Sequence, residues 1–111
     1  MRESSSVTLS LETRLRAEST SAPAWFVAAL GCVPDRKTVR VEGADIEVLC
    51  WGPRGAPGLL LLHGFTAHAD WWGFIAPLLL AGRRVVALSF SGMGQSGWRD
   101  AYSMELHARE A

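Results

Sequence analysis

His63 and Gly64 stand directly after an uninterrupted apolar run, Gly58–Leu62. Such a run is typical of a strand in a parallel sheet, and the carboxyl ends of these strands border the ligand crevice of open α/β sheets. A glycine there lets the backbone approach a ligand closely, and the next N–H, that of Phe65, can donate to an oxyanion. A His-Gly pair alone indicates only a turn whose histidine is satisfied by nearby backbone.

A second glycine motif, Ser91–Gly97, follows a second predicted buried strand, Arg84–Phe90. Its residues 92–97 spell Gly-x-Gly-x-x-Gly, a pattern with which a loop and a helix N-terminus hold a dinucleotide. That use requires a helix that opens inside the motif and an acidic residue about 20 positions later. Residues 98–100 instead indicate a loop, so a dinucleotide-binding domain using Gly92–Gly97 stays an alternative.

The sequence offers no nucleophile, acid or base of a catalytic triad. A Gly-x-Ser-x-Gly elbow is absent. The most similar segment, residues 94–98, has tryptophan in place of the last glycine, which makes Ser96 a weak candidate for the nucleophile. Further along, Ser103, Glu105 and His107 are spaced i, i+2 and i+4 on one predicted helix. Residues two apart on a helix do not face each other, so these three cannot assemble a triad.

The histidines and cysteines predict no metal and no cofactor. His63, His68 and His107 match no zinc spacing, and Cys32 and Cys50 form no Cys-x-x-Cys pair. Two isolated cysteines make no disulfide framework and are interpreted as reduced thiols, which indicates a cytoplasmic protein.

The charge balance excludes several classes of partner. Eleven Lys and Arg balance eleven Asp and Glu among 111 residues, so no basic field attracts nucleic acid or an anionic membrane. No stretch approaches the roughly 20 apolar residues that a membrane-spanning helix needs. We therefore predict neither a nucleic-acid nor a membrane partner, and at most one domain.

The elements that must position these motifs begin after a polar tail. Residues 1–22 are rich in serine and threonine and predict a disordered tail, and residues 23–111 form the folded part. An apolar helix is expected over 24–30, with Pro23 at its first position. Strands over 38–41 and 46–51 form an antiparallel hairpin around a turn at 43–45.

The two apolar runs are predicted to be strands, each covered on both faces, with a helix between them. Five apolar residues repeat at helical spacing (Trp71, Phe74, Ile75, Leu78 and Leu79), with Asp70 as the cap, Pro77 as a kink and Gly82 as the stop. A last helix runs to Ala111, with Ser103 as its cap and an apolar face that begins at Leu106 and Ala108.

Taken in order, these motifs resemble the N-terminal part of the α/β-hydrolase family. The resemblance rests on Leu59–Thr66, on 70–72 (Asp-Trp-Trp), on Ser91–Gly97 and on the Tyr-Ser at 102–103. It implies an α/β fold class: the N-terminal part of an α/β-hydrolase sheet, with an antiparallel hairpin followed by a parallel βαβ unit, incomplete in this chain.

The resemblance also implies a reaction and roles for individual residues. It implies hydrolysis of an ester or related acyl bond in a small-molecule substrate, by a nucleophilic serine in the complete enzyme. His63 and Gly64 then shape the oxyanion turn, and the backbone N–H of Phe65 is one donor of the oxyanion hole. Gly92 and Gly94, together with Ser96, match a glycine loop whose role in the family is structural.

Two departures qualify the resemblance. The family often has an acid where Ser89 stands, so any salt link formed there is predicted to be absent. No proline closely follows His63 and Gly64, which favours an esterase-like branch over epoxide hydrolases and dehalogenases.

We therefore expect a hydrolase segment with half of an oxyanion hole and no independent activity. A non-catalytic binding or interaction module is the first alternative, ahead of the dinucleotide-binding domain. In the family the strand that ends at Leu62 lies inside the sheet. Here one of its edges is expected to be unpaired, which predicts self-association.

Overall fold

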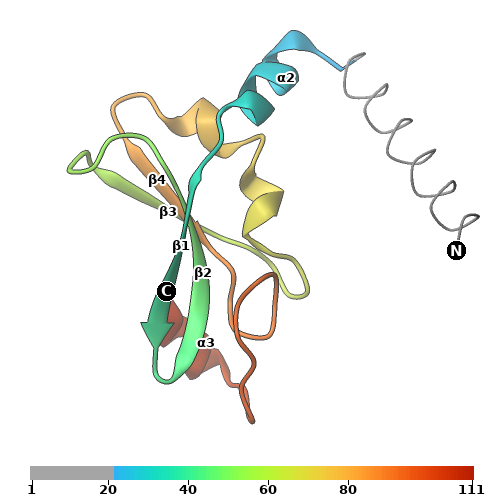
Figure 1. The fold of residues 1–111 in the computed structure, drawn as a ribbon, viewed down its shortest axis with the longest axis vertical. Coiled ribbons are helices and arrows are strands. Elements are labelled where there is room, and N and C mark those ends of the chain that lie inside the picture. The colour runs from blue at the N-terminus through green and yellow to red at the C-terminus, as the bar shows by residue number, and fades with distance from the viewer. Residues whose placement is uncertain (1–21) are drawn as a thin grey trace, which may run out of the picture.

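A computed structural model describes residues 22–111, and the expected tail lies outside these residues except for its last position. The fold is a four-stranded mixed sheet with short helices (Figure 1). The strands are β1 (Asp35–Val41), β2 (Ala44–Trp51), β3 (Gly58–Leu62) and β4 (Arg84–Leu88), in the order β1-β2-β4-β3. The β1–β2 and β2–β4 pairs are antiparallel, and β3–β4 is parallel. The predicted α/β class, with a hairpin followed by a parallel pair, is confirmed.

The hairpin turn is one residue away from its predicted place. Val41 pairs with Ala44, so only Glu42 and Gly43 form the turn. Both have positive φ, 44° and 82°, as the tight type I′ hairpin turn requires. Strand β1 begins at Asp35 and not at position 38, because the polar residues 35–37 lie on an exposed edge strand where no apolar alternation is needed.

The predicted α-helix after residue 70 is wrong. Two 3₁₀ helices connect β3 to β4, η1 (Ala69–Trp72) and η2 (Ala76–Leu79). The N–H of Gly73 bonds to the carbonyl of Asp70 at 3.0 Å, in the tighter 3₁₀ pattern. Pro77 has no N–H to continue an α-helix, and its ring would clash with the carbonyl four residues earlier, that of Gly73.

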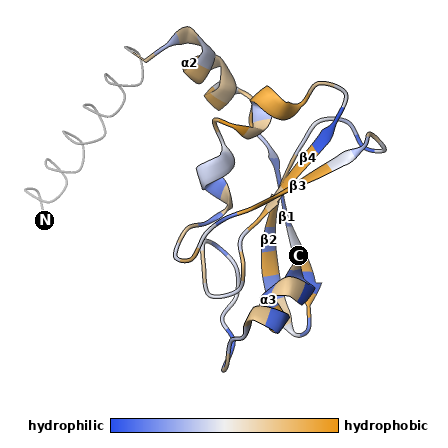
Figure 2. Cartoon of the chain, turned by 180° about the vertical axis from the view of Figure 1, so that it is seen from behind, coloured by the Kyte–Doolittle hydropathy of each residue, from blue (hydrophilic) through white to orange (hydrophobic). Residues whose placement is uncertain are grey.

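The sheet has one well-covered face and one face that is covered only in part. The buried cluster under η1 and η2 contains Leu49, Trp51, Ala69, Ala76, Val85 and Ala87. A smaller cluster on the other face contains Ala44, Ile46 and Leu88. Leu60 and Leu62 of β3 point to this second face and are 43% and 44% exposed. Hydrophobic colour runs along β3 and β4 (Figure 2). The prediction that both faces of β3 are covered is therefore wrong for the described residues.

The two α-helices confirm the predicted elements with small shifts. Helix α2 is Ala24–Gly31, so Pro23 precedes the first helical residue. Helix α3 is Met104–Glu110, and the Ser103 hydroxyl caps it by accepting the Leu106 N–H at 3.0 Å. No helix among residues 22–111 is long and apolar enough to cross a bilayer.

The expected inner face of α3 is corrected. Ala108 is exposed, whereas Leu106 and His107 are half-buried and Glu110 is buried. The helix therefore turns a carboxylate toward the sheet, because that carboxylate finds donors there.

Candidate functional site

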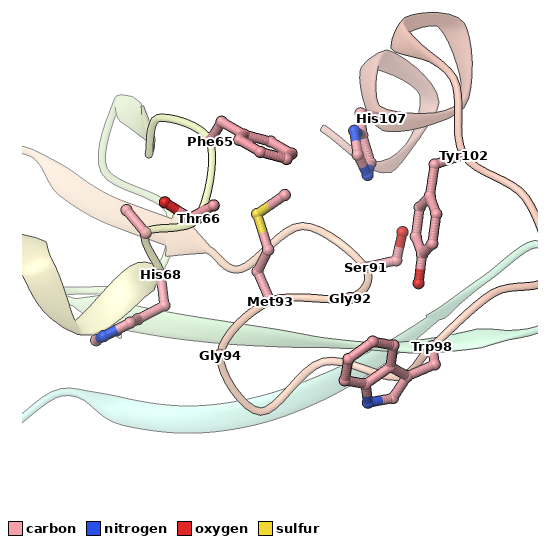
Figure 3. Close-up of a pocket in the computed structure, with 11 residues that line it drawn as sticks. Phe65, Thr66, His68, Ser91, Gly92, Met93, Gly94, Trp98, Tyr102 and His107 are labelled. Atoms are coloured by element: carbon pink, nitrogen blue, oxygen red, sulfur yellow. The ribbon is translucent and has the colours of Figure 1, made fainter.

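Two loops follow β3 and β4, and because these strands are parallel both loops begin at the same end of the sheet. With the N-terminal end of α3 they surround an open hollow of about 580 Å³. Its lining contains no Asp, Glu, Lys or Arg, and consists of Phe65, Thr66, Ala67, His68, Ser91, Gly92, Met93, Gly94, Trp98, Tyr102 and His107. Phe65, Met93 and His107 extend toward the same space (Figure 3). The hollow is thus uncharged and mostly apolar, at the place where open α/β sheets bind ligands.

His63 is buried and holds the first of these loops on the end of β4. Its Nε2 lies 3.0 Å from the backbone N of Phe90, so Nε2 accepts that N–H. Its Nδ1 lies 2.6 Å from the carbonyl oxygen of Gly64. The hydrogen-bond pattern assigns the proton to Nδ1, which donates to that carbonyl. Both ring nitrogens are occupied by backbone groups, so the imidazole has no free atom for proton transfer.

The peptide unit between Gly64 and Phe65 has a fixed orientation. Its carbonyl accepts from His63 Nδ1 and, at 3.1 Å, from the Ala67 N–H. In a trans peptide the N–H points opposite to the carbonyl, so the N–H of Phe65 is directed away from these two donors. It makes no hydrogen bond to any other residue in the described part of the chain. The unit therefore presents an oriented donor without a protein partner.

The space beside Gly64 is open. A Cβ built on Gly64 meets no heavy atom within 4 Å, and the residue has no positive φ. Neither crowding by the protein nor turn geometry requires glycine here. Its small size leaves room next to the Phe65 N–H, as the approach of a ligand would need.

Most backbone amides of the glycine loop, residues 91–97, are already hydrogen-bonded within the protein. They donate to protein acceptors in the pairs Gly92–Gly97, Met93–Phe90, Gln95–Glu47, Ser96–Met93 and Gly97–Asp45. No helix opens inside this loop, and the next helical residue is Met104. A phosphate would meet occupied amides and a carboxylate, so the geometry does not fit the dinucleotide alternative.

Ser96 belongs to the framework of this loop. Its buried hydroxyl accepts the Glu47 N–H at 2.8 Å and donates to the Ser89 carbonyl at 2.5 Å. With its proton committed to a carbonyl, Ser96 has the contacts of a structural link and not those of a nucleophile activated by a base.

Ser89 itself carries no charge and forms no ion pair, but an ion pair between Glu47 and Arg36 lies beside it. The Ser89 hydroxyl donates to Oε1 of Glu47 at 2.8 Å, and Oε2 of Glu47 lies 3.3 Å from Arg36. The neighbouring strand β2 thus supplies the acid. A period of two along β2 places Glu47 on the same face as buried Leu49 and Trp51, and this was the signal that the sequence analysis missed.

A second buried carboxylate, Glu110 of α3, was also missed. Its oxygens accept from the Ser91 N–H (2.8 Å), the Ser91 hydroxyl (2.5 Å) and Arg99 Nε (2.9 Å). Burial raises the pKa of Glu110, but these hydrogen bonds outweigh burial and hold the pKa below its ordinary value. Arg99 also donates to the carbonyls of Val41 and Glu42, both at 2.7 Å. Spacing along the sequence gives no signal for these contacts.

The three residues considered as a downstream triad do not form one. Ser103 caps α3, Glu105 is exposed, and the His107 ring lies beside those of Phe90 and Tyr102, with centroids 5.1 and 5.7 Å apart. No side-chain hydrogen bond joins Ser103, Glu105 and His107, and the one contact between Ser103 and His107 is the helical backbone bond from the His107 N–H to the Ser103 carbonyl at 3.1 Å. Within residues 22–111 no group of three His, Cys, Asp or Glu side chains is arranged to hold a metal.

Comparisons with known proteins agree on one fold. A family model of the alpha/beta hydrolase fold matches residues 57–110. A serine hydrolase-like protein of Dictyostelium discoideum is 41% identical over 56 residues, 49% of this chain and 16% of that protein. A fluoroacetate dehalogenase of a Burkholderia species is 38% identical over 50% of this chain and 18% of its own length. The solved structure of a bacterial membrane phospholipase A has a TM-score of 0.68 and 30% identity, over 94% of this chain and 32% of its own.

The chain thus spans less than a fifth of the length of these curated relatives. They include both a dehalogenase and a serine hydrolase-like protein, so the esterase-like branch stays a prediction.

Proposed function

The chain belongs to the α/β-hydrolase family and corresponds to an N-terminal part of its fold, and from this premise we propose that it supplies an oxyanion-hole segment. The reaction is hydrolysis of an ester or related acyl bond in a small molecule. The nucleophilic serine, its histidine and acid, and the second oxyanion donor come from outside the described residues.

The free N–H of Phe65 is the observation that supports this proposal most. When a nucleophilic serine attacks the substrate carbonyl, the carbonyl oxygen gains negative charge and a donor at that place stabilises the transition state. The peptide unit of Gly64 and Phe65 is held by His63 from the opposite side, so it need not reorient during the reaction. One such donor contributes roughly 2.7–4 kcal/mol to transition-state stabilisation.

The hollow beside this donor supports an uncharged, apolar substrate group. Its lining carries no acidic or basic side chain of Asp, Glu, Lys or Arg, and the rings of Phe65, Trp98 and Tyr102 border it. Transfer of an apolar acyl or alkyl group from water into the hollow is favourable, whereas a charged group would lose its hydration and meet no partner. Cys32 and Cys50 are both free, which supports a cytoplasmic location as part of the proposal.

The test removes the backbone N–H of Phe65 from an active enzyme and leaves the other parts of its site unchanged. Residues 57–110 replace the matching segment of an active serine esterase of the family, and kcat and KM are measured with an apolar ester. Phe65→Pro removes the donor, and we expect kcat to fall about 10²–10³-fold. The matched control Phe65→Ala keeps the donor and removes only an exposed ring. An active chimera in which Phe65→Pro and Phe65→Ala have the same kcat would contradict the proposal.

A non-catalytic binding module is a second candidate, favoured by the apolar hollow and by the absence of a nucleophile–base pair among residues 22–111. The two candidates differ in the chimera. A binding module takes up an apolar fluorescent ligand in the hollow but gives no active chimera.

A further inference from the structure

We propose that Glu47 is a positioning residue for this site, a single buried carboxylate that joins the loop carrying Phe65 to the glycine loop. The structural part of the proposal stands on contacts alone. Its catalytic consequence rests on the proposed function, because only an oxyanion donor needs its loop held in one place.

Glu47 reaches the loop after β3 through the Ser89 hydroxyl. The Glu47 side chain is 7% exposed and comes from the middle of β2. Its Oε1 accepts the Ser89 hydroxyl proton at 2.8 Å, and the same hydroxyl accepts the Ala69 N–H at 2.9 Å. A hydroxyl has one proton, so the carboxylate determines its direction and leaves its lone pairs to Ala69. The end of the loop 63–68 is thus held by Glu47 through one intermediate.

A second route from Glu47 reaches the next residue of the same loop end. Its Oε2 lies 3.3 Å from Arg36 of β1, and Arg36 forms two hydrogen bonds with the Asp70 carboxylate, at 2.5 and 3.2 Å. Asp70 was expected to cap a helix, but its carboxylate instead completes this chain of contacts. Two independent links therefore hold consecutive residues, Ala69 and Asp70, relative to one carboxylate.

The glycine loop packs directly on the same carboxylate. Oε1 of Glu47 accepts the Gln95 N–H at 3.3 Å. A Cβ on Gly94 would lie 2.6 Å from the Ser89 hydroxyl oxygen and 3.0 Å from Glu47 Oε1, so only glycine permits this approach. Both loops that line the hollow are consequently held by Glu47, which is not itself among the lining residues.

The proposal is tested on the full 111-residue chain, labelled with ¹⁵N, by amide chemical shifts and hydrogen exchange. Glu47→Leu keeps the volume but removes both acceptor oxygens. We expect the amides of Ala69 and Gln95 to exchange about tenfold faster or more, and the Phe65 amide resonance to move. The amides of Val85 and Ala87 in β4 should not change.

Two further variants separate positioning from general stability. Glu47→Gln keeps one acceptor oxygen for Ser89 and should restore the Ala69 and Phe65 signals, although it lacks the charge that pairs with Arg36. Asp45→Asn changes another acid of β2, one that pairs with Arg40 on the surface. It should leave all three loop amides unaltered.

The outcome that overturns the proposal is a Glu47→Leu chain with native β4 amides and unchanged signals at Ala69, Gln95 and Phe65. If Glu47→Leu does not fold, Ser89→Ala takes its place, since it removes only the intermediate hydroxyl. It should release the Ala69 amide and leave Gln95 protected, and no change at Ala69 would overturn the proposal. These readouts do not depend on catalysis, so failure of the proposed function would leave them intact.

Discussion

The loops after β3 and β4 leave the same edge of the sheet but use their backbones in opposite ways. In the glycine loop, residues 91–97, every amide except that of Gly94 donates to a protein acceptor. In the loop after β3, the carbonyl of Gly64 is held by His63 and the N–H of Phe65 has no partner in the described structure. All amides of the first loop but one are thus bonded within the protein, whereas the second loop has an oriented donor left for a ligand.

The glycines of the two loops differ in the same way. A side chain on Gly94 would collide with Ser89, His68 and Glu47, whereas a side chain on Gly64 would meet nothing within 4 Å. Glycine thus makes room for the protein in one loop and leaves room for a ligand in the other. A glycine pattern in a sequence cannot distinguish the two uses, because the difference lies in what surrounds each Cα.

The largest expected loss of stability follows from removing the Glu110 carboxylate that holds the glycine loop. Glu110→Ala leaves Arg99 buried without its carboxylate and removes both acceptors of Ser91. Breaking one partner of a buried pair typically costs about 3–5 kcal/mol, and we expect a loss of that size in the free energy of unfolding, measured with urea. Glu105→Ala, at an exposed position of the same helix, should change stability by less than about 0.5 kcal/mol. Equal effects would contradict the role assigned to Glu110.

Substitution of Gly94 or Gly64 by alanine directly tests the difference between the two loops. Gly94→Ala introduces a contact of 2.6 Å at a φ of +52°, and it should cost roughly 2–4 kcal/mol from strain and overpacking together. Gly64→Ala should change stability by less than about 0.5 kcal/mol. Urea unfolding of both variants provides the measurement, and a destabilising Gly64→Ala would show that protein atoms and not open space surround that position.

The Glu110 anchor should also make stability depend on pH. Because its pKa is lowered in the folded state, Glu110 stabilises the fold above the ordinary pKa of a glutamate, about 4.3, and the contribution is lost as pH falls through the lower folded value. Glu110→Gln should be less stable than the parent by about 1.5–3 kcal/mol at pH 7. We expect this difference to shrink below about pH 4, and a constant difference would contradict the assignment.

The smallest expected effect concerns the strands that carry the loops. Strand β4 is paired on both sides, whereas β3 pairs only with β4 among the described strands. The unpaired edge predicts self-association, which Leu60→Lys should weaken by about tenfold through charge at the exposed strand. Leu78→Lys, at another exposed leucine, in η2, is the control. Light scattering that shows the parent chain as a dilute monomer would contradict the prediction.

The sequence predicted the architecture because apolar runs and turn residues are local signals. The order of the four strands and of the first and last helices, the parallel pair and the Ser103 cap are all confirmed. The segment after Asp70 was misread because apolar spacing suits an α-helix, although Pro77 cannot continue one and the chain forms two 3₁₀ helices instead. Glu47 and Glu110 were missed because their partners lie 42 and 19 residues away in the sequence, at Ser89 and Ser91.

Amide hydrogen exchange in the ¹⁵N-labelled chain is the most direct test of the contrast between the two loops. We predict that the Phe65 amide exchanges at close to the rate of an unprotected peptide, whereas the amides of Gly92 and Gly97 exchange at least about 100-fold more slowly because they are hydrogen-bonded within the protein. A protected Phe65 amide, or unprotected amides at Gly92 and Gly97, would contradict the account.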